Sequence, residues 1–145
     1  MIVDKDLIDQ LFKQAEVNPR KRLNYDMRTS PEDGSQRMLN AMLPGTEVAI
    51  HRHPNSNENV ILVTGRMDEV LYEEVEPQVN GEGCTVQGSR LKEVERFHLC
   101  PKEGRYGCQV PKGVWHTVEV IEPSVIYEAK DGKYGEDGSE MYSKV

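Results

Sequence analysis

The sequence has few cysteines, few aromatic residues and no long apolar run. Its three cysteines, Cys84, Cys100 and Cys108, form no CxxC pair, so neither a disulfide framework nor a zinc ribbon is expected. No apolar stretch approaches the ~20 residues of a membrane-spanning helix. The N-terminus mixes charges from Asp4 onward, unlike a signal peptide. We therefore expect a cytoplasmic protein without a membrane role.

Positive charge is also scarce. The formal net charge is -7 and the pI is about 5.1, whereas nucleic-acid binding needs clustered Lys and Arg. The one concentrated basic run, residues 20–22, is expected to lie in a solvated loop over 20–31. With 145 residues, 37% of them hydrophobic and 30% charged, the chain suits a soluble domain with a real core. The expected partner is a small molecule, not a nucleic acid.

One helix and many short strands are predicted. An acidic cap at Asp4 or Asp6 begins a helix over about residues 4–17, where apolar residues recur every three or four positions. Strand-like patterns broken by Gly and Pro turns fill about 35–130, and 131–145 reads as a polar tail. No internal repeat or domain boundary appears. The pattern predicts a single all-β domain, a jelly-roll barrel with a short N-terminal α-helix.

Three of the four histidines and one glutamate form a pattern typical of metal ligands. His51 and His53 share one face of a strand, because successive side chains alternate. Glu58 follows a turn-like run and opens the next strand, so it can return to that face. His98 and His116 remain as further ligands, and we favour His116 because it follows a Pro-x-Gly turn. The predicted metal site is therefore His51, His53, Glu58 and His116.

The ligand types restrict the metal. Three imidazoles and one carboxylate suit a divalent transition metal, such as zinc, iron, manganese or nickel, better than calcium or magnesium, which prefer oxygen ligands. If a coordination position stays open, the ion can polarise a substrate carbonyl or hydroxyl. The expected cofactor is one such ion.

A substrate-binding arginine is also predicted. Over residues 36–43 aliphatic and mixed positions alternate, so either face of this strand could point inward. Arg37 shares the parity of the aliphatic set, and we predict that it enters the cavity at the strand's open end and holds an anion, with Asn40 outside. The alternative is that Arg22 or Arg28 reaches over the barrel mouth to hold such a group.

The histidine motifs resemble those of cupins. The first cupin motif is Gly, five residues, His-x-His, three or four residues, Glu, six residues and Gly. All its positions are matched, by Gly45, His51, His53, Glu58 and Gly65. The second is Gly, five residues, Pro-x-Gly, two residues, His, three residues and Asn. It is matched at Pro111, Gly113 and His116, while Val120 replaces the Asn and the leading Gly is displaced.

A narrower resemblance covers almost the whole chain. The N-terminal helix and the stretches 35–54, 107–120 and 126–137 look like the WbuC family of cupin-fold metalloproteins. This resemblance implies a jelly-roll fold and a bound metal. It also implies a link to bacterial surface polysaccharides, because members are often encoded among genes for them. Cupin folds commonly pair subunits through their sheets, so a homodimer is expected.

Two functions from different classes follow. The first is a metal-dependent enzyme, such as an isomerase, epimerase or oxygenase, acting on a small polar substrate such as a sugar or sugar nucleotide in bacterial surface-polysaccharide metabolism. The second is a non-catalytic metal- or sugar-binding module that regulates or scaffolds such a pathway. An open coordination position in a polar cavity favours the enzyme, and a fully coordinated ion in an apolar interior favours the module. A metal-free epimerase is least favoured, since no aspartate partner for the motif histidines is evident.

Overall fold

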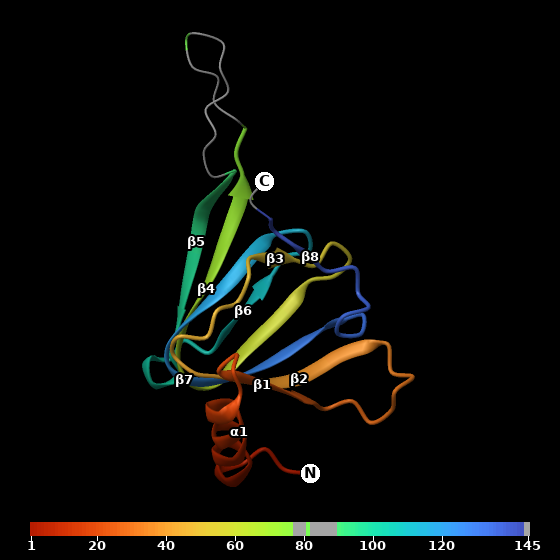
Figure 1. Cartoon of the computed structure of the whole chain (residues 1–145), viewed down its shortest axis with the longest axis vertical. Coiled ribbons are helices and arrows are strands. Elements are labelled where there is room, and N and C mark those ends of the chain that lie inside the picture. Colours follow the sequence, from red (N-terminus) through yellow and green to blue (C-terminus); the bar gives the residue numbers. More distant parts are fainter. Residues whose placement is uncertain (77–80, 82–89, 144–145) are drawn as a thin grey trace.

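The computed structural model describes residues 1–76, 81 and 90–143, and it confirms an all-β fold with one N-terminal α-helix (Figure 1). The elements are α1 (Lys5–Val17), β1 (Arg22–Asp26), β2 (Ser35–Met42), β3 (His51–Arg52), β4 (Glu58–Glu74), β5 (Leu91–Leu99), the 3-10 turn η1 (Pro101–Glu103), β6 (Gly107–Val110), β7 (Trp115–Asp131) and β8 (Glu140–Met141). No helix among the described residues is long and apolar enough to cross a membrane. The glycines of residues 78–88 predict a hairpin, and this segment, which contains Cys84, lies outside the described residues apart from Gly81.

The strands form one curled antiparallel sheet. Its order is β1-β2-β7-β3-β8, and β4 pairs with β5, β6 and β7. Strands β4 and β7 are each 17 residues long and pair along most of their length. Their register shifts between Leu62 and Met67, around Gly65, whose φ is +108°. This irregularity falls where the sheet curls, so each long strand serves both halves of the barrel (Figure 1).

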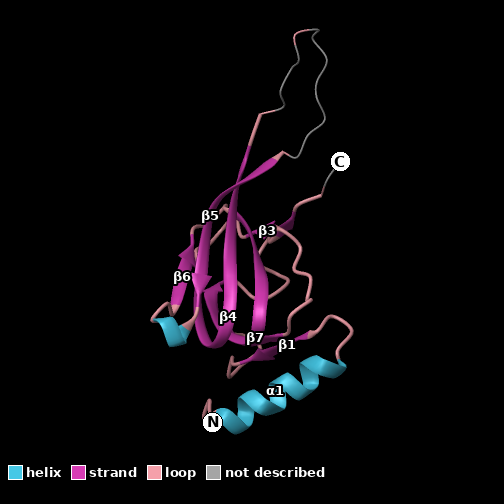
Figure 2. Ribbon diagram, turned by 90° about the vertical axis from the view of Figure 1, so that its left-hand side faces the viewer, coloured by secondary structure: helices cyan, strands magenta, loops and turns pink. Residues whose placement is uncertain are grey.

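Apolar side chains pack in two clusters, one inside the curled sheet and one under the helix. The inner cluster contains Met42, Val60, Leu62, Met67, Leu99 and Ile126. The cluster under the helix contains Leu11, Ala15, Leu39, Ala41 and Val125. Helix α1 lies outside the sheet beside β1 (Figure 2), and the Asp4 side chain caps it by accepting a hydrogen bond from Leu7 N at 3.0 Å. The helix therefore covers the aliphatic face of β2 and leaves the other face for the interior.

Two segments differ from the prediction. The solvated loop expected over 20–31 begins with strand β1, which pairs with β2 from Arg22↔Met42 to Asp26↔Met38. The polar segment after residue 131 also contributes a strand, because β8 pairs with β3 and Tyr142 N donates to Ile50 O at 2.8 Å. Both segments reach the region of the predicted metal site.

Candidate metal centre and the adjoining cavity

The structure brings His51, His53 and His116 together. Strand β3 pairs with β7 so that His51 lies directly opposite His116, and His53 is two residues further along the chain. The ring centroids of His51 and His116 are 4.2 Å apart, and that of His53 is 5.0 and 5.2 Å from them. One nitrogen from each ring lies within 4.8 Å of the others, close enough for all three to hold a single metal ion.

Hydrogen bonds at Nδ1 orient the rings. Backbone carbonyls of Ala49 and Val114 accept from Nδ1 of His51 and His116 at 2.8 and 2.9 Å. A carbonyl can only accept, so Nδ1 carries the proton and Nε2 keeps a free lone pair, the form that binds metals. Burial lowers the pKa of His116 to about 4, which keeps it neutral. Nε2 of His116 is buried without a hydrogen-bond partner, and Nε2 of His53 is buried facing a Glu58 oxygen 2.8 Å away, with which it forms no hydrogen bond while both atoms offer only lone pairs. Orphaned, buried lone pairs of this kind fit a metal ion.

The Glu58 carboxylate lies beside the ring nitrogens of His53 and His116. Its side chain is 6% exposed, with Oε2 2.8 Å from His53 Nε2 and Oε1 3.9 Å from His116 Nε2. Burial would raise the pKa of Glu58, but the side-chain contact with His53 holds it below the ordinary value. The carboxylate therefore stays ionised beside the imidazoles. The structure thus brings the four predicted ligands together. Metal binding by these residues stays a prediction.

A carboxylate that sequence reasoning missed stands behind His53. Asp137 Oδ2 is 3.3 Å from His53 Nδ1, and Ser139 Oγ is 2.7 Å from the same atom. Asp137 in turn forms a buried ion pair with Lys130. Carboxylate–histidine pairs of this kind orient metal-binding imidazoles. No spacing rule could have found Asp137, because it lies 84 residues from His53 on a segment read as a polar tail.

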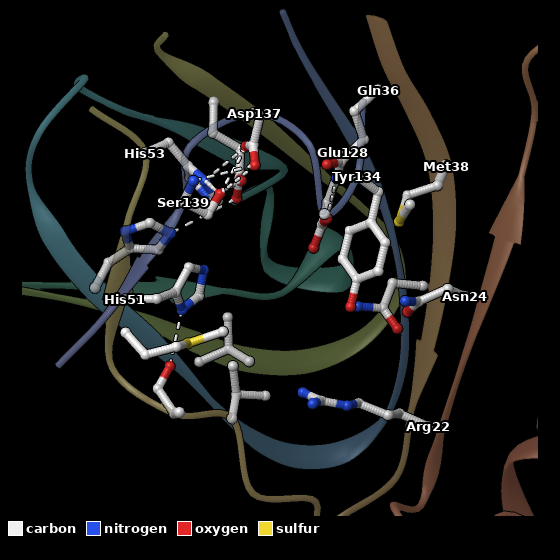
Figure 3. Close-up of a pocket in the computed structure, with 18 of the residues that line it drawn as sticks. Arg22, Asn24, Gln36, Met38, His51, His53, Glu128, Tyr134, Asp137 and Ser139 are labelled. Atoms are coloured by element: carbon white, nitrogen blue, oxygen red, sulfur yellow. Dashed lines mark hydrogen bonds and ion pairs between the residues drawn. The ribbon is translucent and has the colours of Figure 1, made fainter. Parts of the chain in front are cut away.

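The histidines line one side of a cavity of about 360 Å³ (Figure 3). Apolar side chains, Met38, Met42 and Val118 among them, line part of it. Its polar and charged lining residues include Arg20, Arg22, Asn24, Gln36, Asn40, Glu69, Glu128, Tyr134 and Asp137. In Figure 3, Arg22 and Asn24 enter from β1, across the cavity from His51. The volume lies at the lower end of the range of about 300–1,000 Å³ that is typical of small-molecule sites.

Arg37 does not line this cavity. Its side chain is 54% exposed and pairs with Asp33 at 2.9 Å, while Gln36 and Asn40, of opposite parity, face the interior. The inward assignment of Arg37 is therefore wrong. The reason is that α1 covers the aliphatic face of β2, so the amide-bearing face turns inward. The alternative arginine, Arg22, is the one that reaches the cavity.

The other residues considered for a functional role lie outside the cavity lining. His98 is exposed on β5, with Nδ1 2.8 Å from Asp68 Oδ1. Trp115 does not line the cavity. It donates to Glu74 and packs under Arg52, whose guanidinium carbon is 4.4 Å from the ring centroid. Cys100 and Cys108 are free thiols.

Two buried acids share the cavity with the histidines. Both carboxylate oxygens of Glu69 are buried without a partner, and burial raises its pKa well above the ordinary value. Burial also raises the pKa of Glu128 to about 8. The charge of Glu58 adds to this rise, and a hydrogen bond from Asn40 and the charges of Lys130 and Arg22 oppose it. Glu128 therefore keeps a proton at neutral pH.

The raised pKa of Glu128 predicts a pH-dependent stability. The unfolded chain loses this proton near pH 4.5 and the folded protein near pH 8. The associated stability is thus fully present below pH 4.5 and is lost as the pH rises through 8. Glu128→Gln cannot lose a proton, so it should stabilise metal-free protein at pH 8.5 and much less at pH 5. Urea denaturation at both values measures this, with Glu95→Gln, an exposed acid on β5, as the control. An equal effect of Glu128→Gln at both values would contradict the assignment.

Together, the curled antiparallel sheet and the histidine cluster define a protein of cupin jelly-roll fold with a candidate metal site. The chain belongs to the family described as "Domain of unknown function (DUF6016)", whose profile matches residues 3–81. No curated protein matches the sequence.

Solved structures of cupin fold resemble the chain at low sequence identity. The capsular polysaccharide assembling protein CapF from Staphylococcus aureus is 14% identical with a TM-score of 0.58, and the match covers 88% of this chain and 33% of CapF. Hydroquinone 1,2-dioxygenase PnpCD is 16% identical with a TM-score of 0.56, covering 92% and 80%. Oxalate oxidase is 12% identical with a TM-score of 0.54, covering 86% and 57%. The chain thus spans about half of oxalate oxidase and a third of CapF, and the likeness establishes the fold alone.

Proposed function

We propose that this protein is a metal-dependent enzyme that acts on a small polar molecule, such as a sugar or sugar nucleotide. One observation carries the proposal: the three histidines and Glu58 converge on a cavity that Arg22, Glu128 and other polar side chains also line. A closed structural ion needs no adjoining space, whereas an ion that binds substrate does. The cavity therefore favours the enzyme over a non-catalytic module.

Different residues would bind the metal, orient a ligand and donate a proton. His51, His53, His116 and Glu58 would hold the ion, which would supply a Lewis acid for a substrate oxygen. Asp137 and Ser139 hold the His53 ring in place. Glu128, protonated at neutral pH and lining the cavity, can give a proton to a bound substrate.

The pathway is part of the proposal. The sequence resembles the WbuC family, whose members are often encoded among genes for bacterial surface polysaccharides. CapF, one of the similar structures, is described as a capsular polysaccharide assembling protein. We therefore place the substrate among the sugars of that metabolism.

Elemental analysis of protein purified without a metal-binding tag tests the proposal. The native protein should contain about one equivalent of zinc, iron, manganese or nickel. A variant carrying His51→Ala and His116→Ala should contain none. The matched control is His98→Ala, which removes the one histidine outside the cluster and should leave the metal content unchanged. A native protein that stays metal-free after reconstitution would overturn the proposal.

A further inference from the structure

Arg22 is an unpaired positive charge inside the cavity. It projects from β1 across from the histidines (Figure 3), and its Nε is buried without a hydrogen-bond partner. Among the described residues no carboxylate lies within ion-pairing distance of its guanidinium; most of the other arginines described, including Arg28, Arg37, Arg52, Arg66 and Arg96, have such a partner. Arg20, also on the cavity lining, adds a second positive charge. Although the chain has a net charge of -7, Arg20 and Arg22 place positive charge on the cavity lining.

The other unpaired atoms on the cavity lining are hydrogen-bond acceptors. Gln36 Nε2 donates to Glu128 at 2.9 Å, which leaves Gln36 Oε1 buried and without a donor. Asn40 also donates to Glu128, and its Oδ1 is likewise buried and unpaired. Buried polar atoms are rarely left without a hydrogen-bond partner, because each unpaired atom destabilises the folded protein. These two oxygens require donors, such as the hydroxyl groups of a ligand.

The unpaired groups thus differ in kind from one side of the cavity to the other. The histidines offer lone pairs, Gln36 and Asn40 offer amide acceptors, and Arg22 on β1 offers a guanidinium. Building on the proposed function, we infer that the substrate is a polyhydroxylated anion of about monosaccharide size, whose carboxylate or phosphate pairs with Arg22 while its hydroxyls meet Gln36 and Asn40. A planar guanidinium binds either anion through paired hydrogen bonds, so both remain within the inferred class.

Calorimetric titration of the full chain with three sugars tests this inference. The probes are glucuronate, with a carboxylate, glucose 1-phosphate, with a phosphate, and glucose, with neither. At least one anion should bind wild-type protein about tenfold or more tightly than glucose, because a charged hydrogen-bond partner is lost with glucose. The stronger of the two anions identifies the group that the site takes. Equal binding of all three sugars, or binding of none, would overturn the inference.

Two variants locate the anion-binding group. Arg22→Gln should lose the preference for the anion, and Arg22→Lys, which keeps the charge, should retain part of it. The matched control is Arg37→Gln, which removes an arginine from the outer face of the neighbouring strand and should leave the preference intact. Loss of the preference in Arg37→Gln but not in Arg22→Gln would overturn the assignment.

Metal content separates this test from that of the proposed function. Each titration is run on protein of measured metal content, with and without a chelator. Metal binding without an anion preference would defeat the inference and leave the proposed function standing. An anion preference that depends on Arg22, in protein that binds no metal, would defeat the proposed function and leave the inference standing.

Discussion

Replacing Gly65 by alanine is expected to destabilise the protein by roughly 2–5 kcal/mol. Two costs combine. The φ of +108° lies where side chains other than glycine's are strained, and a Cβ would lie 2.7 Å from Ser124 Cα and closer still to Ser124 Oγ and the Pro123 carbonyl oxygen. The obstacles are largely backbone of β7, so they cannot rotate away. Urea denaturation with the slope held in common would measure the loss.

Gly104→Ala is the matched control for Gly65→Ala. Its φ is +76°, but nothing lies within 4 Å of an added Cβ, so only the conformational cost of about 1–2 kcal/mol applies. The excess at Gly65 therefore measures how tightly β4 and β7 are joined at the bend. If the two variants lose equal stability, the two strands can separate there at no cost.

Asp137→Asn is the second change with a large expected effect. Asp137 pairs with Lys130, and the two side chains are only 4% and 1% exposed. Burial would raise the pKa of Asp137, but Lys130 and Ser139 hold it well below its ordinary range. Neutralising the acid leaves the Lys130 ammonium buried without a counter-charge, which costs about 3–5 kcal/mol. Denaturation of the metal-free variant measures this cost apart from any effect on metal binding.

Two further variants test the burial of this pair. Lys130→Met combined with Asp137→Asn should recover much of the loss, because no lone charge remains. Glu136→Gln breaks the neighbouring Lys133 pair, which is 4.0 Å apart with side chains 34% and 71% exposed. It should cost less than about 0.5 kcal/mol. A cost below about 1 kcal/mol for Asp137→Asn would mean that water reaches Lys130.

The metal-site residues could be predicted because their pattern is local. His51, His53 and Glu58 fall within eight residues, so strand alternation and one short turn bring them near one another. His116 required a choice against His98, and the Pro-x-Gly turn before it favoured the histidine that the structure places opposite His51. The fold followed from many short strands separated by turn residues.

The substrate side of the cavity could not be predicted in the same way. β2 has apolar residues on both faces, so parity could not tell Arg37 from Asn40 until the position of α1 was known. β1 carries Arg22 and Asn24 toward the cavity and Leu23 and Tyr25 toward the helix. Polar residues that line an interior cavity resemble surface residues in a sequence, so this strand was read as a solvated loop. Local rules are expected to fail at functional positions.

The pairing of β8 with β3 has a consequence for the order in which the site is completed. His51 is held between His116 on β7 and Met141 on β8, and the cavity wall near His53 comes from Asp137 and Ser139. During synthesis these residues leave the ribosome more than 80 positions after the histidines they enclose. A nascent chain that has reached Lys130 already carries all three imidazoles but has neither the acid behind His53 nor the strand beside His51. The site is therefore assembled only once the C-terminal segment has been translated.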